Sequence, residues 1–180
     1  MVFGKDCGRR EKNPGAESVC LYGRRNRAAG ASVVHVDASR GMVAQAKENA
    51  ALSGLGDAPI RYIVDDCKKF VEREIRRGNR YEAVIMDPPS YGRGPSGEVW
   101  KIEDSVDELI GLAAQLLSDK PLFFLVNSYT TGLSPMAMEY ILGMKIVTRY
   151  GGSLAAGELG LPVTATGLQI PCGASARWES

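Results

Sequence analysis

The stretch VIMDPPSYGRGP, residues 84–95, joins an apolar run to an acid, two prolines and a glycine-rich tail. The run VIM predicts a buried strand, because an uninterrupted apolar run is typical of a strand covered on both faces. Proline fixes φ and lacks an amide donor, so the chain beyond Asp87 must leave the sheet along a rigid, extended path. We therefore expect Pro88 and Pro89 to present free carbonyls that can accept an exocyclic amine. The plain alternative is a turn that merely ends the strand.

Strands and helices alternate on both sides of this motif. Strand alternating with helix at this spacing predicts an α/β fold, a mostly parallel sheet with helices on both faces. Two final segments, 145–151 and 166–178, have no helix between them, and we expect them to pair as an antiparallel C-terminal hairpin. This ending resembles that of Rossmann-like class I methyltransferases. The expected strands are 31–39, 60–66, 81–87 and 121–128, and the expected helices are 42–54, 67–78, 101–117 and 134–143.

The composition is that of an ordinary soluble globular chain of 180 residues, with 44% hydrophobic and 24% charged residues. A net charge of +1 neither demands nor excludes a nucleic-acid partner. Four widely spaced cysteines and one histidine argue against a structural zinc site, so we expect no metal. No apolar run approaches the ~20 residues of a membrane span, and no signal peptide is visible. The sequence therefore predicts a cytoplasmic protein without a membrane partner.

Acids close three of the predicted strands, at Asp37, at residues 65–66 and at Asp87. In open α/β sheets ligands bind at the carboxyl ends of the strands, so these acids should share one rim. Asp37 could accept both hydroxyls of a ribose, and Asp66 could accept an adenine amino group while Met42 packs on the ring. An adenosine-bearing cofactor needs that pair of acceptors. Capping of the following helix is the plain alternative for each acid alone.

The segment after the prolines has the composition of a mobile loop that contacts substrate. Tyr91 offers a flat face on which a flipped base could stack. Arg93 and Lys101 could contact phosphate, and Trp100 could add a second stacking surface. We expect Tyr91 to act with the Asp87 motif in catalysis and the other three to bind substrate.

Residues 29–178 resemble the S-adenosylmethionine-dependent ribosomal RNA methyltransferases, the group with the large-subunit rRNA cytosine and guanine enzymes. The stretches that carry the resemblance are AAGASVVHVDASRGMVAQAKENAALSGL, RYIVDDCKKFV, VIMDPPSYGRGPSGEVWKIED, FFLVNSYTTGLS and GLQIPCGASARW. The resemblance implies S-adenosylmethionine as cofactor and RNA, 23S rRNA in particular, as substrate. It places Asp37 and Ser39 at the cofactor's ribose side and Asp66 at its adenine. Asp87, Pro88, Pro89 and Tyr91 would face the transferable methyl group.

The base nitrogen is the favoured acceptor, because carbon-5 methylation of cytosine needs a cysteine nucleophile. The corresponding enzymes carry that cysteine after the strand that is PLFFLV here, where this chain reads Asn-Ser-Tyr-Thr, residues 127–130. We expect Asn127 to contact substrate. Cys67 and Cys172 lie elsewhere, and a buried structural role is the simpler interpretation of both.

The N-terminal segment departs from the family pattern. The glycine-rich turn that should approach the cofactor's methionine part is replaced by GAESVCLYGRRNRAA, residues 15–29. A choice of codons for residues 16–27, read one base later, gives the family-like string Leu-Asn-Leu-Phe-Ala-Tyr-Thr-Gly-Gly-Ala-Thr. We infer that residues 1–27 are truncated and frameshifted, partly disordered or standing in for the first strand, before a methyltransferase domain over 28–180.

Two other functions were considered. A non-catalytic remnant that keeps the fold without the cofactor loop is the main alternative. A nucleotide-binding oxidoreductase is disfavoured because the chain has no GxGxxG turn.

Overall fold

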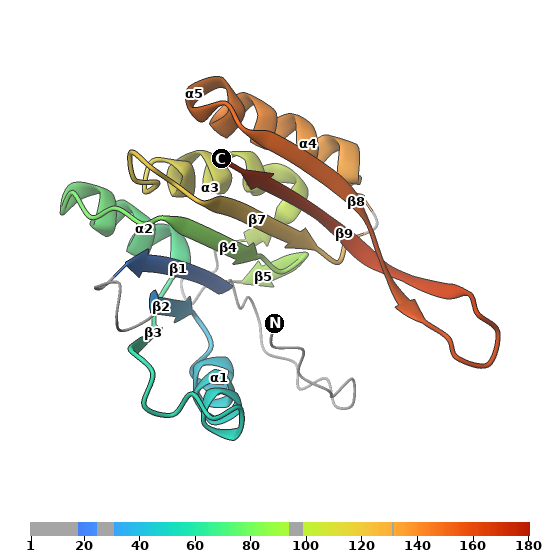
Figure 1. The fold of residues 1–180 in the computed structure, drawn as a ribbon, viewed down its shortest axis with the longest axis horizontal. Coiled ribbons are helices and arrows are strands. Elements are labelled where there is room, and N and C mark those ends of the chain that lie inside the picture. Colours follow the sequence, from blue (N-terminus) through green and yellow to red (C-terminus); the bar gives the residue numbers. More distant parts are fainter. Residues whose placement is uncertain (1–17, 25–30, 94–98, 131) are drawn as a thin grey trace.

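The computed structural model describes residues 18–24, 31–93, 99–130 and 132–180, and for 18–24 it describes the backbone. Among these residues, seven strands form one sheet in the order β3-β2-β1-β4-β7-β9-β8, and β5 and β6 form a separate hairpin (Figure 1). The strands are β1 (Ser18–Arg24), β2 (Ala31–Asp37), β3 (Ile60–Val64), β4 (Ala83–Asp87), β5 (Tyr91–Arg93), β6 (Val99–Lys101), β7 (Phe123–Ser128), β8 (Ser153–Pro162) and β9 (Gln169–Glu179). The helices are α1 (Arg40–Leu52), α2 (Cys67–Arg76), α3 (Ile102–Ala114), α4 (Pro135–Leu142), the π-helix η1 (Gly143–Val147) and α5 (Thr148–Tyr150).

The inner strand β1 runs in the direction opposite to both of its neighbours. It pairs antiparallel with β2 and with β4, whereas β2–β3 and β4–β7 are parallel. The sheet is therefore mixed, and the expectation of a mostly parallel sheet is corrected in this detail. The cause is the length of the connection, because only residues 25–30 separate β1 from β2. A parallel crossover needs about a dozen residues, so six residues permit only an antiparallel return.

One face of the sheet carries most of the core. Helices α2, α3 and α4 contact one another in sequence and cover this face, while α1 contacts β2 and β3. Side chains at alternate strand positions point into the covered face and are buried, whereas Ile85 between two of them is only half-buried. Ala83, on the same face of β4 as Ile85, is 1% exposed, so the described residues cover this second face of VIM only in part. The buried hydrophobic strand residues at these alternate positions are Val34, Val36, Val84, Met86, Phe124, Val126, Ala174, Ala176 and Trp178.

The C-terminal hairpin is confirmed, but its first strand is not the expected one. Residues 145–151, expected as a strand, continue the helix through η1 and α5, and the strand is β8. The β-branched residues of this stretch suggest a strand by propensity. Burial decides otherwise, because Met138, Leu142 and Ile146 recur every four residues and are fully buried. Gly151 and Gly152, with φ of 67° and 85°, then end the helix.

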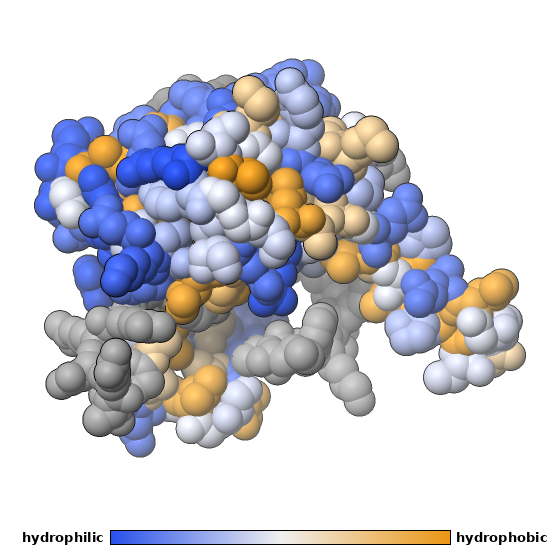
Figure 2. Space-filling view, turned by 45° about the horizontal axis from the view of Figure 1, so that its top comes forward, coloured by the Kyte–Doolittle hydropathy of each residue, from blue (hydrophilic) through white to orange (hydrophobic). Residues whose placement is uncertain are grey.

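Strands β8 and β9 extend beyond the rest of the sheet as a projecting hairpin (Figure 1). Its tip carries exposed apolar side chains, which Figure 2 shows in the projecting arm: Leu161, Leu168 and Ile170. No helix among the described residues is long and apolar enough to cross a lipid bilayer.

Candidate functional site

The acid-bearing ends of the strands meet at one rim of the sheet, as the sequence predicts. Asp37 closes β2, and Asp87 closes β4. Because β1 is reversed, its first residue, Ser18, stands opposite both acids. Asn127 belongs to this rim as well, since Met86 pairs with Val126 and Asn127 is the next residue along β7.

Burial disfavours the charged forms of both acids, and the charge of Asp37 adds to this effect at Asp87. Asp37 is 2% exposed, and burial raises its pKa although the Ser39 amide donates a hydrogen bond to its Oδ1 at 2.6 Å. Burial, and then the charge of Asp37, raise the pKa of Asp87 to about 6. A carboxyl group with such a pKa can accept or release a proton near neutral pH, which suits a general acid or base.

The other predicted cofactor residues lie at helix starts beside this rim. Ser39 caps α1 by accepting a hydrogen bond from the Met42 amide at 3.3 Å. Asp66 caps α2 and accepts from the Lys69 amide at 2.8 Å. The capping alternative therefore holds for Asp66, yet its side chain remains exposed, and Met42 is 46% exposed. Both residues keep surface that a ligand could use.

The glycine-rich tail forms a hairpin rather than a wholly irregular loop. β5 and β6 pair antiparallel, with Tyr91 opposite Lys101 and Arg93 opposite Val99; residues 94–98 of the expected loop lie outside the described part. Tyr91 is half-exposed, and its hydroxyl accepts a hydrogen bond from Arg93 Nε at 2.9 Å. The hairpin thus brings a tyrosine face and two cations together.

Trp100 takes a role other than the expected one. Its indole Nε1 donates a hydrogen bond to the Pro89 carbonyl at 2.8 Å, and its ring is half-buried against the core. The prediction of a free Pro89 carbonyl is therefore wrong. Trp100 anchors residues 87–90, here named the Asp87 loop, instead of offering an open stacking face. A second hydrogen bond holds this loop, because the Ile102 amide donates to the Ser90 carbonyl at 3.2 Å.

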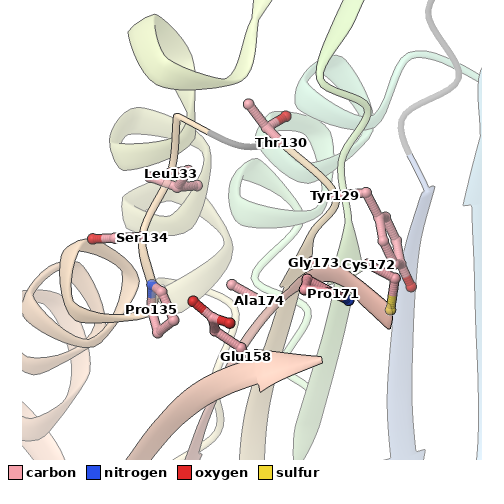
Figure 3. Close-up of a pocket in the computed structure, with 10 residues that line it drawn as sticks. All are labelled: Tyr129, Thr130, Leu133, Ser134, Pro135, Glu158, Pro171, Cys172, Gly173 and Ala174. Atoms are coloured by element: carbon pink, nitrogen blue, oxygen red, sulfur yellow. The ribbon is translucent and has the colours of Figure 1, made fainter. Parts of the chain in front are cut away.

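A cleft of about 400 Å³, here named the Glu158 cleft, lies next to this loop (Figure 3). It is lined by Tyr129, Thr130, residues 133–135 at the start of α4, Glu158, and residues 171–174 of β9. The Thr130 and Ser90 hydroxyls share a hydrogen bond that joins the cleft to the Asp87 loop. Burial, then the charge of Asp87, raise the pKa of Tyr129. The cleft therefore lies beside the acid rim.

No sequence pattern indicates that the residues of this cleft lie together. Tyr129 was noted only because it stands where a catalytic cysteine would be. Glu158 lies between the two expected strands 145–151 and 166–178, in a segment predicted to be a loop, whereas the structure places it in β8. The signal was present, because Leu154, Ala156 and Glu158 alternate as a strand requires.

An open α/β sheet with acids along its carboxyl rim and an antiparallel hairpin at its end defines the class I methyltransferase architecture. Solved structures agree with this class. The S-adenosylmethionine-dependent methyltransferase from Agrobacterium tumefaciens is 38% identical with a TM-score of 0.76, over 84% of this chain and 50% of that one. SMU.776, solved in complex with SAH, has a TM-score of 0.60 over 79% of this chain and 38% of its own at 16% identity, which shows the fold alone.

Curated relatives point in the same direction. Ribosomal RNA large subunit methyltransferase K/L of Shewanella frigidimarina is 32% identical over 88 residues, 48% of this chain and 12% of the relative. Ribosomal RNA large subunit methyltransferase I of Aeromonas hydrophila is 29% identical over 59 residues, 33% of this chain and 15% of the relative. No protein-family model matches the chain.

The resemblance to S-adenosylmethionine-dependent rRNA methyltransferases and the Rossmann-like fold class, both expected from the sequence, are thereby confirmed. The chain spans about an eighth of the length of the first curated relative and half of the Agrobacterium tumefaciens structure.

Proposed function

We propose that this chain carries the site of an S-adenosylmethionine-dependent methyltransferase that acts on RNA, specifically large-subunit rRNA, at a base nitrogen. The observation that carries this proposal is the 38% identity to the Agrobacterium tumefaciens S-adenosylmethionine-dependent methyltransferase over 84% of the chain. The names of the curated relatives support rRNA as substrate. The Asp87 loop, beside Tyr91 with Arg93 and Lys101, supplies a proton-exchanging carboxyl group and cations for an RNA backbone.

A nitrogen acceptor is favoured because residues 127–130, where the carbon-5 enzymes carry their cysteine, read Asn-Ser-Tyr-Thr, although Cys172 lines the neighbouring cleft. Cys67 is fully buried, and its thiol faces the Val36 carbonyl. The thiol of Cys172 donates to the Leu159 carbonyl at 3.3 Å. If RNA methylated by this protein were digested to nucleosides and yielded 5-methylcytidine, the nitrogen assignment would be wrong.

The described residues fit the cofactor only in part. Met42 and Asp66 are exposed on the adenosine side, but Asp37 is 2% exposed, so ribose hydroxyls could reach its carboxylate only after a rearrangement. The methionine part needs a glycine-rich turn that leaves the central strand at this rim. Here β1 begins at the rim and ends at Arg24 on the opposite edge, next to Ala31. The described residues therefore provide no cradle for the methionine part.

That reversal favours the second candidate, a non-catalytic remnant that keeps the fold and has lost the cofactor loop. Calorimetric titration with S-adenosylhomocysteine separates the two. Micromolar binding supports the methyltransferase, and no heat at millimolar ligand supports the remnant. Replacement of residues 16–28 by the glycine-turn string given above should restore binding if the frameshift hypothesis holds. Sequencing the source DNA across this region tests that hypothesis directly, and a clean open frame would contradict it.

A further inference from the structure

The Glu158 cleft carries a solvent-exposed carboxylate beside apolar side chains of the same strand face. Alternation along β8 places Leu154, Ala156 and Glu158 on one face of the sheet. Leu154 and Ala156 pack against the core on the face that α4 covers. Glu158 lies one step beyond them, where α4 begins. Figure 3 shows its carboxylate pointing between Pro135 and Ala174 into the cleft.

The charge of Glu158 is not neutralised by any residue that the structure describes. No lysine or arginine is among the lining residues, and no described side chain forms a hydrogen bond or ion pair with Glu158. A carboxylate that a ligand covers needs hydrogen-bond donors in exchange for the water it loses. A ligand that covers Glu158 in this cleft therefore needs N–H donors to replace that water, and a phosphate is disfavoured by the local negative charge.

The remaining walls suit a flat ring. Leu133, Pro135 and Pro171 give apolar surfaces on the helix side and the strand side of the cleft. The volume of about 400 Å³ lies in the range of about 300–1,000 Å³ typical of small-ligand sites. We propose that the Glu158 cleft binds an unpaired nucleobase with an exocyclic amine, and that Glu158 accepts the hydrogens of that amine.

The cleft lies beside the Asp87 loop, where the proposed methyl transfer would take place. The Ser90–Thr130 hydrogen bond holds its wall against the Asp87 loop. A base in the cleft thus lies beside the rim at which the proposed methyl transfer would occur. The inference deepens the proposed function and rests on it for its biological meaning, because it names the group that selects the nucleotide. Its binding test needs no cofactor.

The test is a ligand-observed NMR titration of the whole chain with guanosine, adenosine, cytidine and uridine, without S-adenosylmethionine or its product. The three amine-bearing nucleosides should bind at least about fivefold more tightly than uridine, which has a ring N–H but no exocyclic amine. Glu158→Gln should raise their dissociation constants about tenfold, because a hydrogen bond to a charged acceptor is replaced by a neutral one. Glu139→Gln, an equal change of charge on the exposed face of α4, should leave them unchanged.

Uridine binding as tightly as the amine-bearing nucleosides would overturn the inference, and this result needs no variant. Unchanged binding by Glu158→Gln would overturn it as well, provided that its thermal unfolding matches the wild type. Failure of the proposed function looks different. If the chain binds the nucleosides but not S-adenosylhomocysteine, the cleft proposal stands and the methyltransferase proposal fails. If it binds S-adenosylhomocysteine but not the nucleosides, the methyltransferase proposal stands and the cleft proposal fails.

Discussion

Asp37 and Asp87 repel each other across the inner strand β1, and the charge of Asp37 adds to burial in raising the pKa of Asp87. Both stand opposite Ser18, the first residue of a strand that runs against its neighbours. Two desolvated acids with no described cation between them destabilise the folded chain when both are ionised. Such a pair is tolerated where a site needs it, and it makes the stability of this protein depend on pH.

Asp87→Asn should reduce that dependence. The pKa of Asp87 is about 6 in the folded chain and 3.8 without the fold, so the folded chain holds this proton more tightly. The free energy of unfolding should therefore fall as pH rises from about 4 to about 6, and remain lower above it. A difference of about 2 in pKa corresponds to at most about 3 kcal/mol, and solvent screening reduces it. Urea unfolding at pH 4 and pH 7 should show Asp87→Asn gaining stability over wild type only at pH 7.

The variant Asp37→Asn separates the two causes of the raised pKa of Asp87, which are burial and the charge of Asp37. Burial is the larger contribution, so this variant should lower the pKa of Asp87 only in part, as measured by carbon-13 NMR of the carboxyl group. An equal stability difference between Asp87→Asn and wild type at both pH values would contradict the raised pKa.

Sequence patterns located most of this site but not its geometry. Asp37, Asp66 and Asp87 could be placed at one rim because strand ends in an α/β sheet share an edge, whatever the details of packing. The direction of β1 could not be predicted, because its apolar run suits a strand of either direction. The family pattern also has a glycine-rich turn where this chain has the six-residue connection. Trp100 shows the same limit. A tryptophan in a glycine-rich segment suggests stacking on substrate, and only the fold places its N–H against Pro89.

The reversed direction of β1 is open to a direct test by NMR. Antiparallel neighbours bring every second pair of opposed residues to about 4.5 Å between Cα atoms, so their Hα atoms lie close. We expect strong Hα–Hα nuclear Overhauser effects at alternate pairs of the register from Val19–Val36 to Tyr22–Val33. The parallel β2–β3 pair is an internal control and should give none of comparable strength, for example at Val34–Arg61. Their absence between β1 and β2 would show that the inner strand β1 runs parallel.

Trp100→Phe should loosen the Asp87 loop while keeping an aromatic ring in place. The variant loses the hydrogen bond from Nε1 to the Pro89 carbonyl, which we expect to cost about 1 kcal/mol in the free energy of unfolding. Hydrogen exchange of the β5 and β6 amides should become faster. Trp178→Phe is the control, because it removes a similar bond, to the Gly151 carbonyl at 2.7 Å, from a different strand, β9. Faster β5–β6 exchange in both variants would mean that the effect is not local.

Gly173→Ala should disturb the wall of the Glu158 cleft. A Cβ atom at Gly173 would overlap the Ser128 carbonyl oxygen and lie 2.9 Å from Cδ1 of Tyr129, so strand β9 and the tyrosine ring would have to separate. Overpacking of this kind costs about 1–3 kcal/mol. Gly157→Ala is the matched control on the paired strand, since a Cβ there meets no atom within 4 Å. Removing a glycine without a clash restricts the unfolded chain, so Gly157→Ala should be neutral or stabilise by up to about 1 kcal/mol. Urea unfolding of both variants checks the contrast, and equal effects at the two positions would mean that β9 does not approach Tyr129 as closely as the structure places it.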